Sequence, residues 1–156
     1  MKKLLIALVL PLLISGGAQA QSVCPALAGS GNTEVKAATA TPELEPARLM
    51  LDQPASVTLH PGNDVRFAIA PEKHSAADSY GGMLAVDVRE AGTYQVALSG
   101  NAWIDMVRDG AAVASGAHGH DSGCKMVSFA LTPGRHVIQL SGNKQDTIKV
   151  MVSRKS

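Results

Sequence analysis

The residues best suited to chemistry gather in one short stretch, from Ala117 to Cys124, which holds two of the five histidines, a carboxylate and one of the two cysteines. If this stretch is extended, His118 and His120 project to the same side, because alternate residues of a strand share a face. Imidazole and carboxylate together suit zinc, copper or iron. We therefore weigh a divalent metal site made of His118, His120 and Asp121 against a solvated polar loop whose histidines bind nothing.

Two histidines at one spacing make a weak metal motif, because a structural site needs about four ligands. The chain offers three further histidines that the fold would have to bring close, namely His60, His74 and His136. Cys124 can serve as a thiolate ligand only if it is not part of a disulfide. A divalent metal is thus an alternative, and the simpler expectation is that no cofactor binds.

A catalytic interpretation needs a nucleophile with a base in reach and a group that orients the base. The candidate nucleophiles are Ser115, Ser122 and Ser128. The candidate bases are His118, His120 and His136, and the candidate orienting acids are Asp105 and Asp121. No Gly-x-Ser-x-Gly context selects one serine from this set. The sequence therefore predicts no catalytic residue.

The first twenty residues are typical of an export signal. Lys2 and Lys3 precede an apolar stretch from Leu4 to Ile14, and Ala18-x-Ala20 is a cleavage pattern. The apolar stretch is too short for a permanent membrane helix, and no later segment is long and apolar enough. Residues 1–20 are therefore predicted to be a signal peptide, and the mature chain is expected in the periplasm or secreted, without a transmembrane segment.

Two cysteines in an exported chain are most simply explained by one disulfide between Cys24 and Cys124, since exported proteins fold in an oxidising compartment. From residue 21 to 48, Ala, Gly, Ser, Thr and Pro dominate the composition. Such a segment buries little apolar surface by itself. We expect an extended N-terminal arm over residues 21–48, pinned by Cys24, and a β domain over residues 49–156.

Beyond the arm, apolar residues alternate with polar ones to the end of the chain, which predicts β-strands. The expected strands, about nine in number, cover 55–60, 64–70, 83–89, 93–98, 102–108, 111–115, 125–131, 135–140 and 147–153. Gly-containing turns separate them, and Asp109-Gly110 is a strong hairpin signal. Connections this short favour an all-β, antiparallel sandwich or jelly roll, because parallel strands need long crossovers.

Asp105 is the most unusual strand residue, because it shares a row with Trp103 and Val107. An unpaired buried carboxylate is costly, so we expect a partner, namely Arg108, Lys125 or turn amides. The aromatic residues Phe67, Tyr94, Trp103 and Phe129 are predicted to point inward. This leaves Tyr80 as the one exposed aromatic, which argues against a carbohydrate-binding module.

Four stretches resemble the bacterial pre-peptidase C-terminal domain and its jelly-roll relatives: Val57 to Phe67, Gly92 to Leu98, Asp105-x-Val107-x-Asp109-Gly110, and Leu131-x-Pro133-Gly134-x-His136. The resemblance covers roughly residues 51–154. It implies a secreted, non-catalytic accessory domain that accompanies enzymes, although no enzyme is attached here.

The formal net charge of +1, without a basic run, lacks the electrostatic pattern of a nucleic-acid binder. We expect an exported, non-enzymatic β-sandwich protein that binds a small ligand or a protein partner through its loops. The alternative is a metal-binding protein or metal-dependent enzyme using His118, His120 and Asp121. Homogentisate dioxygenases are one example of the enzyme class, but their iron ligands, two histidines and a glutamate, have no match in this chain.

Overall fold

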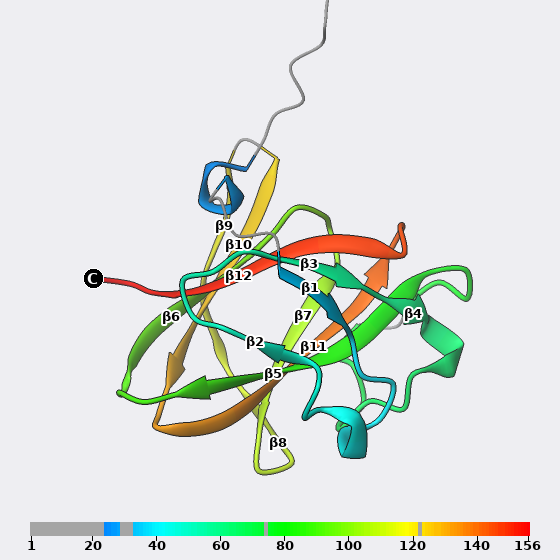
Figure 1. The fold of residues 1–156 in the computed structure, drawn as a ribbon, viewed down its shortest axis with the longest axis horizontal. Helices are drawn as coiled ribbons and strands as arrows, with labels where there is room; N and C mark the ends of the chain where they lie inside the picture. The colour runs from blue at the N-terminus through cyan, green and yellow to red at the C-terminus, as the bar shows by residue number, and fades with distance from the viewer. Residues whose placement is uncertain (1–23, 29–32, 74, 122) are drawn as a thin grey trace, which may run out of the picture.

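The protein is described here by a computed structural model that covers residues 24–28, 33–73, 75–121 and 123–156. The predicted signal peptide, residues 1–20, lies outside these ranges. Two β-sheets pack face to face, and helical structure in the described part is limited to three short 3-10 turns, η1 (Pro25–Leu27), η2 (Thr41–Glu43) and η3 (Gly62–Asp64) (Figure 1). The predicted all-β sandwich is confirmed. Across the described ranges, no helix is long and apolar enough to cross a membrane.

Each sheet has a continuous order of strands (Figure 1). Sheet A runs β1 (Thr33–Lys36), β3 (Ala55–Thr58), β12 (Thr147–Arg154), β6 (Gly92–Leu98), β10 (Cys124–Leu131) and β9 (Ser115–Asp121). Sheet B runs β2 (Arg48–Leu49), β5 (Tyr80–Val88), β11 (Gly134–Asn143), β7 (Trp103–Arg108) and β8 (Ala111–Val113), and β4 (His60–Pro61) also pairs with β5. The pairs β1–β3 and β2–β5 are parallel, and the other pairs are antiparallel.

The core lies between the sheets and follows the alternation of each strand. Sheet A contributes the row Tyr94, Val96 and Leu98 from β6, and sheet B contributes Ile138 and Leu140 from β11, all with 2% exposure or less. Alternate residues of a strand share a face, so one face of each sheet is covered by the other sheet. Period-two alternation in the sequence is therefore the direct cause of the two-layer architecture.

The Asp109-Gly110 hairpin between β7 and β8 forms as predicted. Asp109 has φ 49° and Gly110 has φ 75°, so both turn residues adopt the left-handed conformation. This conformation matches the right-handed twist of the two flanking strands, and Asp-Gly is a preferred pair for it.

The segment expected to be an arm belongs to the sandwich. Its strands β1 and β2 extend sheet A and sheet B at their edges, and Val35, Ala38 and Ala47 are buried in the main core. Gly82 has no side chain, which lets Ala37 lie directly against β5. Much of the described part of the expected arm, from Thr33 to Arg48, therefore pairs and packs with the two sheets, because its small side chains fit against glycine and its backbone pairs with β3 and β5.

The stretch 64–70 is not the predicted strand. It follows η3 as irregular chain and meets the face of sheet B that is turned away from sheet A. The side chain of Gln139, which is completely buried, accepts a hydrogen bond from the amide of Ile69 at 3.0 Å and donates one to its carbonyl at 3.2 Å. This side-chain amide takes the place of a neighbouring strand, so the backbone groups of Ile69 are satisfied without a sheet ladder.

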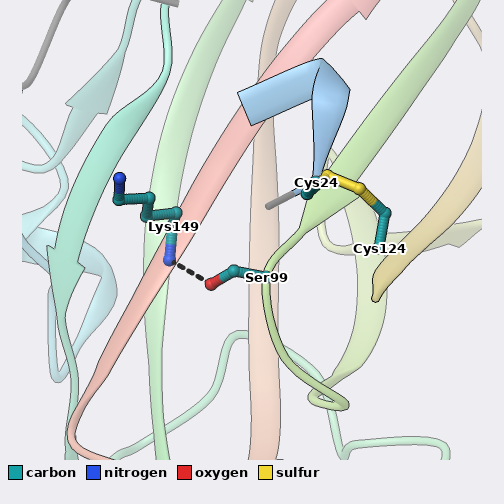
Figure 2. The surroundings of a disulfide bond; sticks show 4 residues. All are labelled: Cys24, Ser99, Cys124 and Lys149. Carbon is teal, nitrogen blue, oxygen red and sulfur yellow. Dashed lines mark hydrogen bonds between the residues drawn. A yellow bond between two sulfur atoms is a disulfide. The ribbon is translucent and has the colours of Figure 1, made fainter. Parts of the chain in front are cut away.

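The disulfide between Cys24 and Cys124 is present, as predicted from the cysteine count. The two Cα atoms are 5.0 Å apart, and the bond closes a loop with a sequence separation of 100 (Figure 2). Cys24 precedes η1 and Cys124 begins β10, and both are buried with Leu27 and Ala97 in a small cluster of their own. Beside it, Ser99 accepts a hydrogen bond from the amide of Lys149 on β12 (Figure 2). The disulfide therefore fastens the start of the described chain to sheet A.

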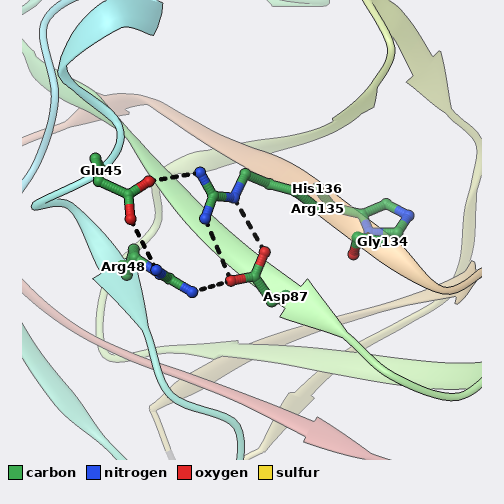
Figure 3. A network of polar contacts seen from close by, with 6 residues as sticks. All are labelled: Glu45, Arg48, Asp87, Gly134, Arg135 and His136. Atoms are coloured by element: carbon green, nitrogen blue, oxygen red, sulfur yellow. Dashed lines mark hydrogen bonds and ion pairs between the residues drawn. The ribbon is translucent and has the colours of Figure 1, made fainter.

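A network of ion pairs holds β2 against β5 and β11 (Figure 3). Arg135 binds Asp87 through two nitrogens, at 3.0 and 3.4 Å, and Glu45 at 2.7 Å, while Arg48 bridges Glu45 and Asp87. Hydrogen bonds from Arg135 lower the pKa of the Asp87 and Glu45 carboxyls below their usual values. All four side chains are substantially exposed, so the network orients the edge strand more than it stabilises the fold.

Candidate ligand pocket at Trp103

A small pocket opens where the edges of the two sheets approach each other, between β7–β8 of sheet B and β9–β10 of sheet A. Its volume is about 100 Å³. Four side chains supply an apolar floor, and they are Ile104, Met106, Val127 and Phe129. Polar groups surround this floor, among them Trp103, Asp105, His118 and Lys125. An apolar cavity with a few convergent polar groups is the usual form of a small-ligand site.

Trp103 lies on the opposite face of β7 from the one predicted. Ile104 and Met106 are the β7 residues that join the main core, so Trp103, Asp105 and Val107 occupy the other face of the strand. Alternation shows which residues share a row, and it does not show which row faces the partner sheet. The inward placement predicted for Tyr94 and Phe129 is confirmed, since both are buried in the core, and the one predicted for Trp103 is wrong.

Asp105 has partners, as the cost of burying a carboxylate requires. The Trp103 indole N–H donates to its Oδ1 at 3.1 Å, and the backbone N–H of Glu72 donates to its Oδ2 at 3.3 Å. Of the expected partners, the described hydrogen bonds show a backbone amide in a connecting segment, while Arg108 binds Thr132 and Lys125 binds the carbonyl of Ala102 instead. Burial dominates over these two hydrogen bonds and raises the pKa of Asp105 above its usual value.

Two lysines lie against the Trp103 ring. The Nζ atoms of Lys73 and Lys125 are 4.6 and 5.0 Å from the ring centroid, within the range of cation–π attraction. The Lys125 ammonium also donates to the carbonyl of Ala102 at 2.8 Å. Burial, and secondarily the charge of Lys73, lower the pKa of Lys125 below its usual value. The pocket therefore has a partly desolvated ammonium at its polar end.

The sequence named Lys125 as a possible partner of Asp105 but did not predict its place in a pocket, although a signal was present. On β10, Lys125 has the same parity as Val127, Phe129 and Leu131, the row that faces the core. A lysine at the end of an inward row must carry its charge out through an opening or meet a partner, because a buried ammonium is costly. The position of Lys73 beside Trp103 had no comparable signal in the sequence, because it depends on how the irregular segment that follows η3 crosses sheet B.

The stretch predicted as a polar loop is largely an edge strand. Residues Ser115–Asp121 form β9 and pair with β10, with His118 opposite Val127 and His120 opposite Lys125. His118 and His120 therefore share a face, as predicted, and both are exposed. Asp121 is the next residue along, so alternation turns it to the other face. Over the residues described, no group of three or more His, Cys, Asp or Glu side chains is arranged to hold a metal ion.

The structure brings together one of the candidate serine and histidine pairs named from the sequence. The Oγ of Ser115 lies 3.0 Å from Nε2 of His118, at hydrogen-bond distance. A serine nucleophile also needs a group that orients the far nitrogen of the histidine. Among the described hydrogen bonds, none reaches Nδ1 of His118, and Asp105 is engaged by Trp103 and Glu72. His136, another candidate base, is buried near Gly134 instead.

Comparison with known proteins supplies no family for this chain. No protein-family model matches it, and no curated protein is similar to it in sequence. The resemblance to pre-peptidase C-terminal domains therefore stays a prediction.

The stability of the protein should depend on the ionisation of Asp105. Because its pKa is raised in the fold, the protonated form is favoured there, so the stability contribution is fully present below the ordinary pKa of 3.8 and is lost as pH rises through the folded pKa. Asp105→Asn removes this titration. We expect the difference in unfolding free energy, variant minus wild type, to increase with pH from about 4 upward, as measured by urea denaturation at several pH values.

The titration of His136 does not affect this comparison of the two proteins. Burial lowers its pKa, so its contribution has the opposite sign and is lost as pH falls. Both proteins contain His136, so its effect cancels in the difference. A difference that stays flat across the acidic range would contradict the assignment to Asp105.

Proposed function

We propose that this chain is an exported, non-enzymatic β-sandwich protein that binds a small amphipathic anion in the pocket at Trp103. The observation that carries the proposal is the ammonium of Lys125 at the polar end of a cavity whose floor is apolar. A lysine offers three donors, and the one protein acceptor described for Lys125 is the carbonyl of Ala102. A carboxylate or similar anion would use the remaining donors, and its apolar tail would cover Phe129 and Met106.

The size of the pocket restricts the ligand. A volume of about 100 Å³ suits a headgroup with a short tail and excludes a peptide or an oligosaccharide. Among the described hydrogen bonds and ion pairs, none joins Asp105 to Lys125; the two oxygens of Asp105 accept from Trp103 and from the amide of Glu72. Charge therefore favours an anion over a cation at the end of the pocket where the ammonium lies.

The same proposal includes that the protein is located in the periplasm or outside the cell. The disulfide between Cys24 and Cys124 supports it, because such bonds persist in oxidising compartments. The predicted export signal at residues 1–20 agrees with it. A secreted accessory role of the kind that the pre-peptidase resemblance implies is compatible with binding a small ligand at an open end of the sandwich.

Trp103 gives a direct test, because it is the single tryptophan of the chain and lies in the pocket. Tryptophan fluorescence is followed during titration with acetate, propionate, butyrate and hexanoate. We expect a saturable change whose affinity rises from acetate to butyrate as apolar surface is buried, by a few-fold per methylene, and then falls when the tail exceeds the pocket.

Two matched variants decide whether the site is the one proposed. Lys125→Met keeps most of the side-chain stem and removes the charge, so it should weaken butyrate binding at least tenfold. Lys149→Met removes an exposed lysine of β12, away from the pocket, and should leave the affinity unchanged. No saturable signal with any of the four anions, or equal affinity in the Lys125 variant and the wild type, would refute the proposal.

A further inference from the structure

Strand β9 is an open edge of sheet A. In the described structure its one pairing neighbour is β10, and its seven residues are exposed or half-buried. Natural edge strands are usually protected by proline, lysine or a very short length, because free backbone groups attract another strand. β9 contains neither proline nor lysine, and its one acidic residue, Asp121, lies at the far end. Its register shift against β10 falls between Ser115 and His118, so the stretch from His118 to Asp121 is regularly paired. The edge is therefore competent to pair with a further strand.

The backbone groups at this edge can be assigned. The amide of Ala117 donates to Oγ of Ser128 on β10 at 2.8 Å, and its carbonyl accepts from the same hydroxyl at 3.3 Å. Both backbone groups of Ala117 thus face β10. The regular ladder beyond the register shift agrees: the amide of Ser99 donates to the carbonyl of Lys149 on β12, so the even-numbered residues of β6 face β10, Met126 faces β9, and its partner Gly119 faces β10. The N–H and C=O groups of His118 and His120, on either side of Gly119, therefore face the open edge.

We propose that two copies of this chain pair antiparallel through β9 around Gly119 and that a zinc ion bound by His118 and His120 of both copies holds them together. In this register, His118 of one copy lies opposite His120 of the other, and each pair exchanges two backbone hydrogen bonds. Residues opposite each other in such a pair have Cα atoms about 5.5 Å apart, and their side chains share a face of the sheet. Four imidazoles therefore meet on one face.

One copy alone cannot complete this site. It supplies two imidazoles on the shared face, and no described group of three or more potential ligands exists within the chain. A structural zinc site takes four ligands in a tetrahedron, which two copies supply. Ser115 already holds Nε2 of His118 at 3.0 Å, an arrangement that leaves the other ring nitrogen for the metal and fixes the ring as outer partners of zinc ligands do.

The test is sedimentation velocity on the purified protein without a histidine tag, in chelator and then with zinc chloride as the sole added metal. We expect a monomer in chelator and a dimer with zinc, saturating at one zinc per two chains. His118→Gln and His120→Gln should each stay monomeric at the same zinc concentration. Circular dichroism checks that both variants remain folded, which is expected because both side chains are exposed.

Asp121→Asn separates this site from a site within one chain made of His118, His120 and Asp121. In the paired register Asp121 lies on the other face of β9, so this variant should form the zinc dimer like the wild type. A monomer that binds one zinc per chain would overturn the proposal, and so would a dimer that forms equally in chelator or in the two histidine variants. Anion binding at Lys125 is measured separately, by Trp103 fluorescence in the presence of chelator, so it is tested whatever the outcome with zinc.

Discussion

Replacing both Cys24 and Cys124 by alanine should lower the free energy of unfolding by about 4 kcal/mol, the largest loss we expect from removing one feature of this protein. The bond closes a loop with a sequence separation of 100, and cross-linking residues so far apart removes much of the entropy of the unfolded chain. Urea denaturation of wild type and variant in the absence of reductant gives the difference. Wild type in reductant should show a similar loss.

A packing control separates the cross-link from the small cluster around it. Leu27 is 3% exposed and packs with the two cysteines, so Leu27→Ala keeps the disulfide and removes apolar contacts. We expect this variant to lose about 2 kcal/mol, as for a core truncation at a site that can partly collapse. If the double cysteine variant loses no more than Leu27→Ala, the chain-entropy explanation is wrong. Two free thiols in unfolded, unreduced wild type would contradict the disulfide itself.

Gln139→Ala should cost about 3 kcal/mol, because it leaves a cavity and removes both hydrogen bonds to Ile69. Gln139 is completely buried, so the amide and carbonyl of Ile69 lose their side-chain partner when it is truncated. The irregular segment should then loosen from sheet B, and Glu72 and Lys73 leave their places beside Asp105 and Trp103. Urea denaturation gives the energy, and Trp103 fluorescence reports the loosening.

Two further variants make this prediction specific. Gln139→Met keeps the length of the side chain and removes both polar atoms, so it isolates the hydrogen bonds from the cavity and should still cost about 2 kcal/mol. Gln145→Ala changes an exposed glutamine near the start of β12 and should stay within about 0.5 kcal/mol of wild type. Loss of stability in Gln139→Ala with an unchanged Trp103 spectrum would mean that Gln139 does not hold the segment against Trp103.

The sequence predicted local features well, because their causes are local. Strict alternation indicated the rows of β6 and β10, and Asp109-Gly110 indicated a tight hairpin. The pairing of Cys24 with Cys124 followed from there being two cysteines in a chain with a predicted export signal. Each of these predictions depends on a few neighbouring residues or on a count.

Placement across the sheets was harder to predict, because it depends on residues distant in sequence. The segment 64–70 alternates like a strand, yet Gln139 pairs with its backbone and no strand lies beside it. The composition of residues 21–48 suggested an arm, yet Ala37 packs against Gly82 and β1 pairs with β3. In both cases the deciding partner lies well outside any window over which periodicity is measured.

The candidate site shows the same division between local features, which the sequence predicts, and placement across the sheets, which it does not. By itself, the sequence determined that His118 and His120 share a face, that Asp105 needs a partner, and that Trp103 and Asp105 share a row. The tertiary structure alone decided that this row faces away from the partner sheet and that Lys125 reaches Trp103 from the other sheet. The physical reason is that alternation is symmetric between the two faces of a strand, and only packing against the rest of the chain makes one of them the inside.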